Sequence, residues 1–168
     1  MTWFILTFQV ILLAIGYFFV ARIFFIFSTF HNAVPYVPTP AKIVKKMVEV
    51  SRIKEGSMTR PIHLIDLGAG TGKMLFHLAW QTPDSVVLYG VEKSFILYVC
   101  SKMRLFTSSA RNRIHLKHGS WDASDLSGID YVFVFLTTKG LAILHPKLEK
   151  ELKEGAVLVS YLFALPRT

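Results

Sequence analysis

The clearest chemical signal in this sequence is an acid followed by glycines at alternate positions. These residues are Asp66, Gly68, Gly70 and Gly72. The acid lies near the end of a short apolar run, residues 62–67, and the glycines lead into residues 73–80, where apolar residues have helical spacing. Glycine has no Cβ, so it adopts positive φ readily and lets a ligand approach the backbone, while a following helix offers unpaired N–H groups. We therefore interpret the segment as a binding turn for a nucleotide-like ligand rather than as a ligand-free connection.

The spacing of the glycines distinguishes between two kinds of ligand. The dinucleotide fingerprint is Gly-x-Gly-x-x-Gly, whereas this chain has Asp-x-Gly-x-Gly-x-Gly. The carboxylate of Asp66 would repel a pyrophosphate, but it can pair with the ammonium group of an amino-acid moiety. S-adenosylmethionine (SAM) carries such an ammonium group and no phosphate. The segment resembles motif I of the class I SAM-dependent methyltransferases. The residues that this resemblance assigns to SAM binding are Asp66, Gly68, Ala69, Gly70 and Gly72.

Further candidate ligands for SAM follow the next two predicted strands. Residues 86–91 are apolar enough for a buried parallel strand, and Glu92 comes directly after them. A carboxylate there can accept two hydrogen bonds from a ribose diol, so we interpret Glu92 as a ribose ligand rather than an ordinary surface acid. After the third predicted strand, Trp121 can flank the adenine and Asp122 can accept from its exocyclic amine. Packing is the alternative role for Trp121, and class I enzymes more often have Gly-Asp where this chain has Gly119-Ser120.

Strands and helices alternate along residues 41–168. The apolar patterns predict strands at 62–67, 86–91, 113–118, 129–136 and 156–163, and helices at 41–50, 73–80 and 94–110. Thr39 is expected to cap the first of these helices, with Pro40 in its first turn. A further helix is expected to begin near Pro146, with Leu148 and Leu152 facing the sheet. This alternation predicts an α/β fold with a Rossmann-like, doubly wound, mostly parallel sheet.

A long apolar stretch precedes this domain. Within residues 3–27 the only strongly polar side chains are Gln9 and Arg22. At about 1.5 Å per residue, the stretch is long enough to cross a bilayer core of about 30 Å. No basic segment precedes it and no small-residue cleavage site follows it, which argues against a secretory signal peptide. We therefore predict one transmembrane helix, a single-pass anchor at residues 1–27.

The residues after the anchor predict how the chain is oriented. Residues 28–40 contain three prolines in six positions and are expected to form a stiff linker. Lys and Arg follow the anchor and none precedes it, so the positive-inside rule places residues 41–168 in the cytoplasm or the equivalent compartment of an organelle. The net charge of +8 favours contact with anionic lipid head groups. Nucleic acid is not an expected partner, because we find no basic stripe interleaved with aromatic residues outside the anchor.

Several segments, taken in order, resemble one family. They are Pro35-Tyr36-Val37-Pro38, Asp66-Leu67-Gly68-Ala69-Gly70-Thr71-Gly72, Gly90-Val91-Glu92, Asp125-Leu126-Ser127, Leu148-Glu149-Lys150-Glu151-Leu152 and Tyr161-Leu162-Phe163-Ala164-Leu165-Pro166. The chain is similar to the membrane-anchored lysine methyltransferases that modify ATP synthase c-subunit and ADP/ATP translocase, and to their prokaryotic relatives. The resemblance implies SAM-dependent methylation of a lysine in an integral membrane protein. Family members continue beyond the fifth strand, so residues 41–168 are expected to form the SAM-binding domain without its last strands.

Two other functions fit the same motifs: a small-molecule or lipid methyltransferase at the membrane surface, and a non-enzymatic SAM-binding scaffold. The sequence identifies no catalytic residue, although Tyr36 and Thr137-Thr138 are candidates for lining an acceptor channel. No metal is expected, because the six histidines show no ligand spacing. The single cysteine, Cys100, excludes an intramolecular disulfide and is expected to be a small core residue.

Overall fold

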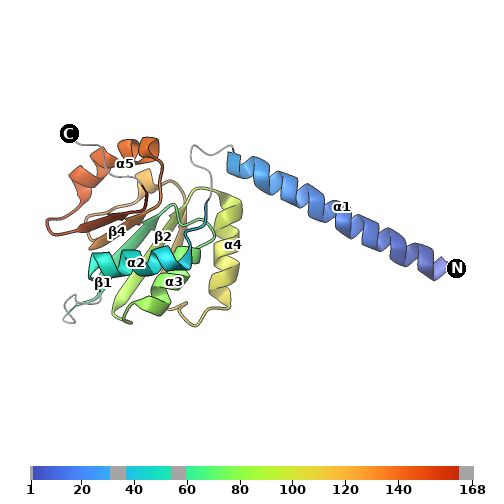
Figure 1. Cartoon of the computed structure of the whole chain (residues 1–168), viewed down its shortest axis with the longest axis horizontal. Helices are drawn as coiled ribbons and strands as arrows, with labels where there is room; N and C mark the ends of the chain where they lie inside the picture. The colour runs from blue at the N-terminus through green and yellow to red at the C-terminus, as the bar shows by residue number, and fades with distance from the viewer. Residues whose placement is uncertain (1, 31–36, 54–59, 163–168) are drawn as a thin grey trace. The chain divides into compact units, whose positions relative to one another are not determined.

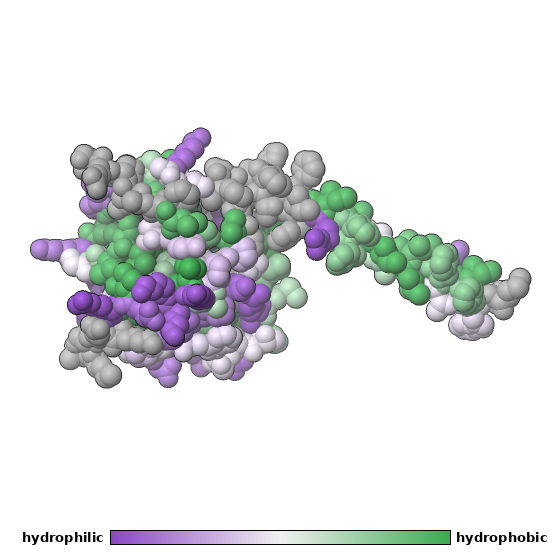
Figure 2. All heavy atoms as spheres, viewed as in Figure 1, coloured by the Kyte–Doolittle hydropathy of each residue, from purple (hydrophilic) through white to green (hydrophobic). Residues whose placement is uncertain are grey.

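The computed structural model describes residues 2–30, 37–53 and 60–162 (Figure 1). The chain divides into two compact units, Met1–Pro35 and Tyr36–Thr168. The first unit contains helix α1 (Thr2–Phe30), which continues three residues beyond the predicted end of the apolar stretch at 27. Its segment Trp3–Ile23 is long and apolar enough to cross a membrane, and none of it is buried. Figure 2 shows mostly hydrophobic side chains along this helix.

A five-stranded sheet forms the centre of the second unit. Its strands are β1 (Ile62–Leu67), β2 (Val86–Glu92), β3 (Ile114–His118), β4 (Tyr131–Val134) and β5 (Val157–Ser160). The strand order is β3-β2-β1-β4-β5, and all four pairings are parallel. The chain therefore moves outward from β1 in both directions, which confirms the predicted doubly wound α/β fold. In such sheets, ligands bind outside the carboxyl ends of the strands, where the order reverses. Here that position is the end of β1.

Helices connect the strands and cover the sheet. They are α2 (Ala41–Ser51), α3 (Lys73–Gln81), α4 (Phe95–Phe106) and α5 (Thr138–Glu151), with a short 3-10 turn, η2 (Trp121–Ala123). Helices α2 and α3 lie side by side against the sheet, as Figure 1 shows. Their buried side chains join those of Leu64, Leu88 and Phe133 in the main hydrophobic core. The connections β1–β2 and β4–β5 run in opposite directions across the sheet, so right-handed crossovers place α3 and α5 on opposite faces.

Helix α5 corrects one sequence prediction. It begins at Thr138, and not near Pro146, which lies inside the helix. The Thr137 side chain caps it by accepting a hydrogen bond from the Gly140 N–H at 3.2 Å. Leu141 and Leu144 are buried. They extend the apolar face of Leu148 by about two turns toward the N-terminus, and this packing outweighs the hydrogen bond that the proline removes. Leu148 faces the core as predicted, whereas Leu152 is the C-terminal cap residue.

Other boundaries differ by smaller amounts. Pro40, rather than Thr39, is the N-terminal cap residue of α2, and α4 ends at Phe106 rather than near Ala110. Strands β4 and β5 are shorter than predicted. Cys100 is exposed, so the prediction that it is a core residue is wrong. Tyr36 lies outside the described residues.

Two polar clusters hold the amino edge of the sheet, opposite the glycine turn. At the start of β4, the Asp130 carboxylate accepts hydrogen bonds from Arg60 at 2.6 and 3.0 Å and from the His63 N–H at 2.9 Å. Lys153 lies 2.7 Å from it. Burial raises the pKa of Asp130, but these hydrogen bonds more than offset burial and hold the pKa far below its usual range. This cluster therefore joins β1, β4 and the segment before β5.

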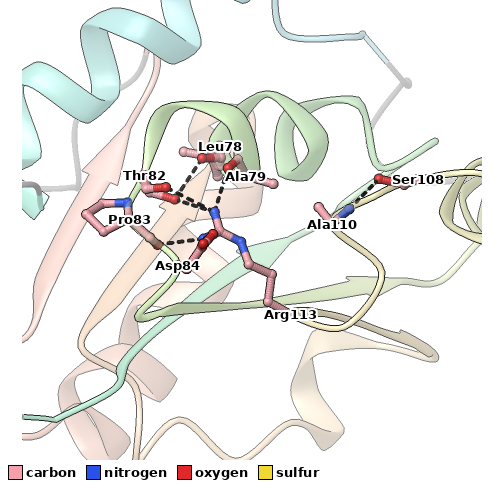
Figure 3. A network of polar contacts seen from close by, with 8 residues as sticks. All are labelled: Leu78, Ala79, Thr82, Pro83, Asp84, Ser108, Ala110 and Arg113. Atoms are coloured by element: carbon pink, nitrogen blue, oxygen red, sulfur yellow. Dashed lines mark hydrogen bonds and ion pairs between the residues drawn. The ribbon is translucent and has the colours of Figure 1, made fainter.

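The second cluster surrounds Arg113, just before β3 (Figure 3). Its guanidinium donates to the Ala79 and Pro83 carbonyls, both at 2.6 Å, and to Thr82, and it pairs with Asp84 at 2.8 Å. The C-terminal carbonyls of a helix need such partners. Arg113 therefore fixes the end of α3 against the start of β3.

We expect Gly90→Ala to destabilise the fold. A Cβ on Gly90 of β2 would overlap Leu75 Cδ1 and would lie 3.0 Å from both Ala69 Cβ and Leu116 Cδ2. Overpacking of this kind costs about 1–3 kcal/mol. Urea unfolding of the full chain in detergent, followed by tryptophan fluorescence, measures the loss. Gly128→Ala is the matched control, because its Cβ would meet nothing within 4 Å. Equal stability of the two variants would contradict the packing argument.

Candidate cofactor-binding site

The glycine turn follows β1 at the carboxyl edge of the sheet. Gly68, Gly70 and Gly72 have φ of 101°, 57° and 72°, in the left-handed region that favours glycine. A Cβ on Gly72 would lie 2.9 Å from Phe76 Cε2 and 3.2 Å from Ser101 Cβ. The predicted glycines are therefore required by the backbone of the turn, and Gly72 also by its packing.

The turn folds over the end of the neighbouring strand. The N–H groups of Gly68 and Ala69 donate to the Val91 carbonyl at 2.9 and 3.0 Å. Ala69 itself is buried. The turn is thus fixed to the residue directly before Glu92.

Asp66 lies inside the sheet, in register with Gly90 of β2 and Phe133 of β4. It is 2% exposed. Burial raises the pKa of Asp66 well above its usual value, and the negative charge of Glu92 raises it further. A positively charged ligand group would stabilise the ionised form of this carboxylate. The ammonium group of SAM has the required charge.

Glu92 brings the second acid to the same turn. One carboxylate oxygen accepts from the Gly70 N–H at 2.7 Å, and the other accepts from the Ser94 N–H at 2.7 Å. Ser94 is the cap residue of α4. The carboxylate therefore joins the glycine turn to the start of the next helix. The structure brings together Asp66, the turn residues and Glu92, as the sequence predicted.

The loop after β3 begins beside Glu92, because the Gly119 N–H donates to the Glu92 carbonyl at 2.9 Å. In this loop Trp121 is half-buried and Asp122 is exposed. The Ser120 hydroxyl donates to the Asp122 carboxylate at 2.8 Å. Trp121 and Asp122 are thus on the same edge of the sheet as the glycine turn, but their contact with adenine stays a prediction.

Helix α5 supports this loop through a pair that the sequence analysis did not identify. Lys147 donates to the Asp122 carbonyl at 3.1 Å and to the Glu151 carboxylate at 2.6 Å. Glu151 in turn accepts from the Leu126 N–H at 3.3 Å. The hydrogen bond from Lys147 lowers the pKa of Glu151. The signal was present as oppositely charged residues four apart on a helix, a spacing that brings side chains together.

The geometry fits SAM. The glycine turn lies at the carboxyl end of β1 with its backbone in the left-handed region, Asp66 offers a buried carboxylate, and Glu92 offers two acceptor oxygens. Among the described residues, no group of three or more His, Cys, Asp or Glu side chains is placed to hold a metal ion.

Comparison with known proteins identifies the family. The ANTKMT methyltransferase domain matches residues 66–168. A protein-lysine N-methyltransferase from Saccharolobus islandicus (strain REY15A) is 31% identical over 132 residues, which cover 79% of this chain and 78% of that protein. The chain belongs to the ANTKMT methyltransferase family. It is a SAM-dependent methyltransferase, and SAM is its cofactor.

Solved structures show the same fold with different acceptors. An RNA methyltransferase from Salinibacter ruber, in complex with S-adenosyl-L-homocysteine, has a TM-score of 0.66 and 24% identity over 74% of this chain and 76% of that one. An O-methyltransferase from Bacillus cereus has a TM-score of 0.56 and 13% identity over 77% and 58% of the two chains. At these identities, the likeness supports the methyltransferase fold and leaves the acceptor open.

We expect SAM affinity to fall on acidification at a higher pH than for an ordinary aspartate, whose pKa is about 3.9. The pKa of Asp66 is raised in the free protein, so lowering the pH protonates this residue early and removes the charge that pairs with the ammonium group. Asp66→Asn should bind SAM about ten- to a hundredfold more weakly near neutral pH, since hydrogen bonds to charged groups contribute about 1.5–3 kcal/mol.

Isothermal titration calorimetry across the acid range tests this expectation. Asp66→Asn should also lose most of the pH dependence. Asp125→Asn is the matched control, because Asp125 is exposed and hydrogen bonds from Ser127 lower its pKa. The control should keep the wild-type profile. Unchanged affinity in Asp66→Asn would contradict the assignment of Asp66 to the ammonium group.

Proposed function

We propose that this methyltransferase is anchored in a membrane by α1 and methylates a lysine of an integral membrane protein. The observation that carries the proposal is the 31% identity to a protein-lysine N-methyltransferase over most of both chains. The apolar segment Trp3–Ile23 supports the membrane part of the proposal. An enzyme held at the bilayer meets integral membrane proteins at high effective concentration.

We assign the contacts to SAM residue by residue. Asp66 pairs with the ammonium group, because its carboxylate is buried and needs a cation. Glu92 accepts hydrogen bonds from the ribose hydroxyls. These hydrogen bonds replace part of the contacts that its carboxylate makes with the Gly70 and Ser94 N–H groups. The backbone of Gly68, Ala69, Gly70 and Gly72 lines the cofactor. Trp121 and Asp122 contact the adenine from the loop after β3.

The reaction needs a neutral lysine nitrogen. An unperturbed lysine has a pKa of about 10.4, and an apolar channel lowers the pKa because it disfavours the charged form. SAM supplies a methyl group on a positively charged sulfur. A bound SAM would donate this methyl group to the lysine nitrogen, with the electron pair of the carbon–sulfur bond left on sulfur, and the methylated nitrogen would then lose a proton. The protein contributes by positioning and by excluding water. Thr137, just after β4, and Tyr36 are the candidates for the channel.

We propose a single-pass topology with the catalytic domain on the cytoplasmic side, or the equivalent side of an organelle membrane. Lys42, Lys45 and Lys46 of α2 follow α1 and are exposed. Such residues near a membrane segment favour the cytoplasmic side and attract anionic lipids.

Methyl transfer from radiolabelled SAM to native membranes tests the function. With the full chain, we expect label in a protein band and methyl-lysine in that protein by mass spectrometry. Gly70→Arg should remove the activity, because Gly70 is buried with φ of 57° at the centre of the turn. Gly128→Arg is the matched control with the same added side chain at an exposed glycine, and it should keep the activity.

Other outcomes point to the alternative functions. Label in the extracted lipid would indicate a lipid methyltransferase, and label in small solutes a small-molecule enzyme. SAM binding with no label in any fraction would favour a non-enzymatic scaffold. Each of these results would contradict the lysine proposal.

A further inference from the structure

Helix α4 carries its exposed apolar side chains on one face. We name this face the α4 stripe, and its members are Phe95, Val99, Met103 and Phe106. Their spacing of four, four and three residues places them in one line along the helix. Phe95 is 64% exposed, Met103 69% and Phe106 82%, and Val99 is partly exposed.

The stripe faces away from the core. The side chains of α4 that are buried are Leu97, Ser101 and Leu105, which lie on the opposite side of the helix. A surface helix normally places its apolar face on the core and polar residues outside. Helix α4 has an apolar face on each side, so its outer face needs a different explanation.

Exposed basic residues lie on α4 and in the segments next to it. On a helical wheel, Lys102 lies beside Phe95 and is exposed. Arg104 is also exposed, but it lies about a quarter turn beyond Met103, where its guanidinium donates to the Thr71 carbonyl at 3.4 Å and lies over the Phe76 ring. Residues 93–118 contain six Lys or Arg and no Asp or Glu. Of these six, Arg113 is used in the cap of α3, and the other five are exposed. A line of large apolar side chains with exposed cations nearby fits a membrane surface, which is apolar beneath an anionic layer.

We propose that the α4 stripe lies on the membrane, with its apolar side chains among the acyl chains just below the head groups and its basic residues at anionic lipid phosphates. Helices of this composition bind in the plane of the interface through buried apolar area and attraction to anionic lipids. This inference rests on the membrane anchoring proposed for α1. Ten residues, 31–40, separate α1 from α2, and they span at most about 35 Å when fully extended. The catalytic domain of an anchored chain is therefore within reach of the bilayer.

The stripe begins at the cofactor site. Phe95 directly follows Ser94, whose N–H donates to Glu92. A membrane in contact with Phe95 would therefore lie at the mouth of the site. An acceptor lysine at the same depth, at the head-group level of a membrane protein, would reach the cofactor without leaving the bilayer surface.

Depth-dependent fluorescence quenching tests this placement. The full chain, in which Cys100→Ser removes the single cysteine, receives Met103→Cys and an environment-sensitive dye. It is reconstituted into vesicles of phosphatidylcholine and phosphatidylglycerol with brominated acyl chains. The matched control carries the dye at Lys150→Cys, an exposed position of α5, and is tethered by the same anchor.

We expect the dye at 103 to shift to the blue and to lose about half of its emission or more, while the dye at 150 changes little. The loss at 103 should fall in pure phosphatidylcholine and at high salt, because screening weakens contact with anionic lipids. Equal emission of both dyes with the chain floating on vesicles would overturn the stripe proposal alone. A chain that does not float with the vesicles would overturn the anchoring on which it rests.

Two further results would assign the stripe to another partner. Energy transfer between labelled copies at 103, without quenching by lipid, would indicate a second copy of the chain. A spectral change at 103 on adding single-stranded RNA, again without quenching, would indicate nucleic acid. Either result would overturn the membrane placement.

Discussion

The glycine turn is held against the end of β2, and the rest of the site depends on this contact. Val91 accepts from the N–H groups of Gly68 and Ala69, and the side chain of the next residue, Glu92, accepts from the Gly70 N–H. The three consecutive backbone N–H groups that follow β1 are therefore bound by the last two residues of β2. This places both acids of the site around one turn, and it aligns the starts of α3 and α4.

The two edges of the sheet use charge in different ways. At the amino edge, Asp130 is surrounded by Arg60 and Lys153, and Arg113 is surrounded by carbonyls and Asp84. Each of these charged groups has its oppositely charged partner within the protein, so these pairs contribute to holding the fold together. At the carboxyl edge, Asp66 is buried near a second acid, and its ionised form is disfavoured. A buried acid in such surroundings is typical of a functional site, because a ligand supplies the compensating charge.

Much of this arrangement could be predicted from the sequence. Asp66 and Glu92 each lie at the end of an apolar strand, and parallel strands end at the same edge of a sheet, so their proximity followed from pattern alone. The start of α5 could not be obtained in this way. Gly140 and Pro146 interrupt the local helical preference, and the burial of Leu141 and Leu144 outweighs them only once the helix meets the sheet.

The contacts of Lys147 and Glu151 with the loop after β3 could not be predicted from the sequence either, because their partner atoms are backbone groups far away in the chain. The outward apolar face of α4 was missed for a related reason. Apolar residues occur on both sides of this helix, so periodicity did not indicate which side faces the sheet, and Cys100 was assigned to the wrong one.

The same glycines restrict how this protein could be stabilised by engineering. Replacing glycine by alanine commonly stabilises a protein, because it reduces the conformational freedom of the unfolded chain. This substitution would not stabilise the protein at Gly68, Gly70 or Gly72, where φ is positive. It would not do so at Gly90 either, where the packed layers leave no volume for a methyl group. The entropy that these residues lose on folding is therefore a fixed cost of having this cofactor site.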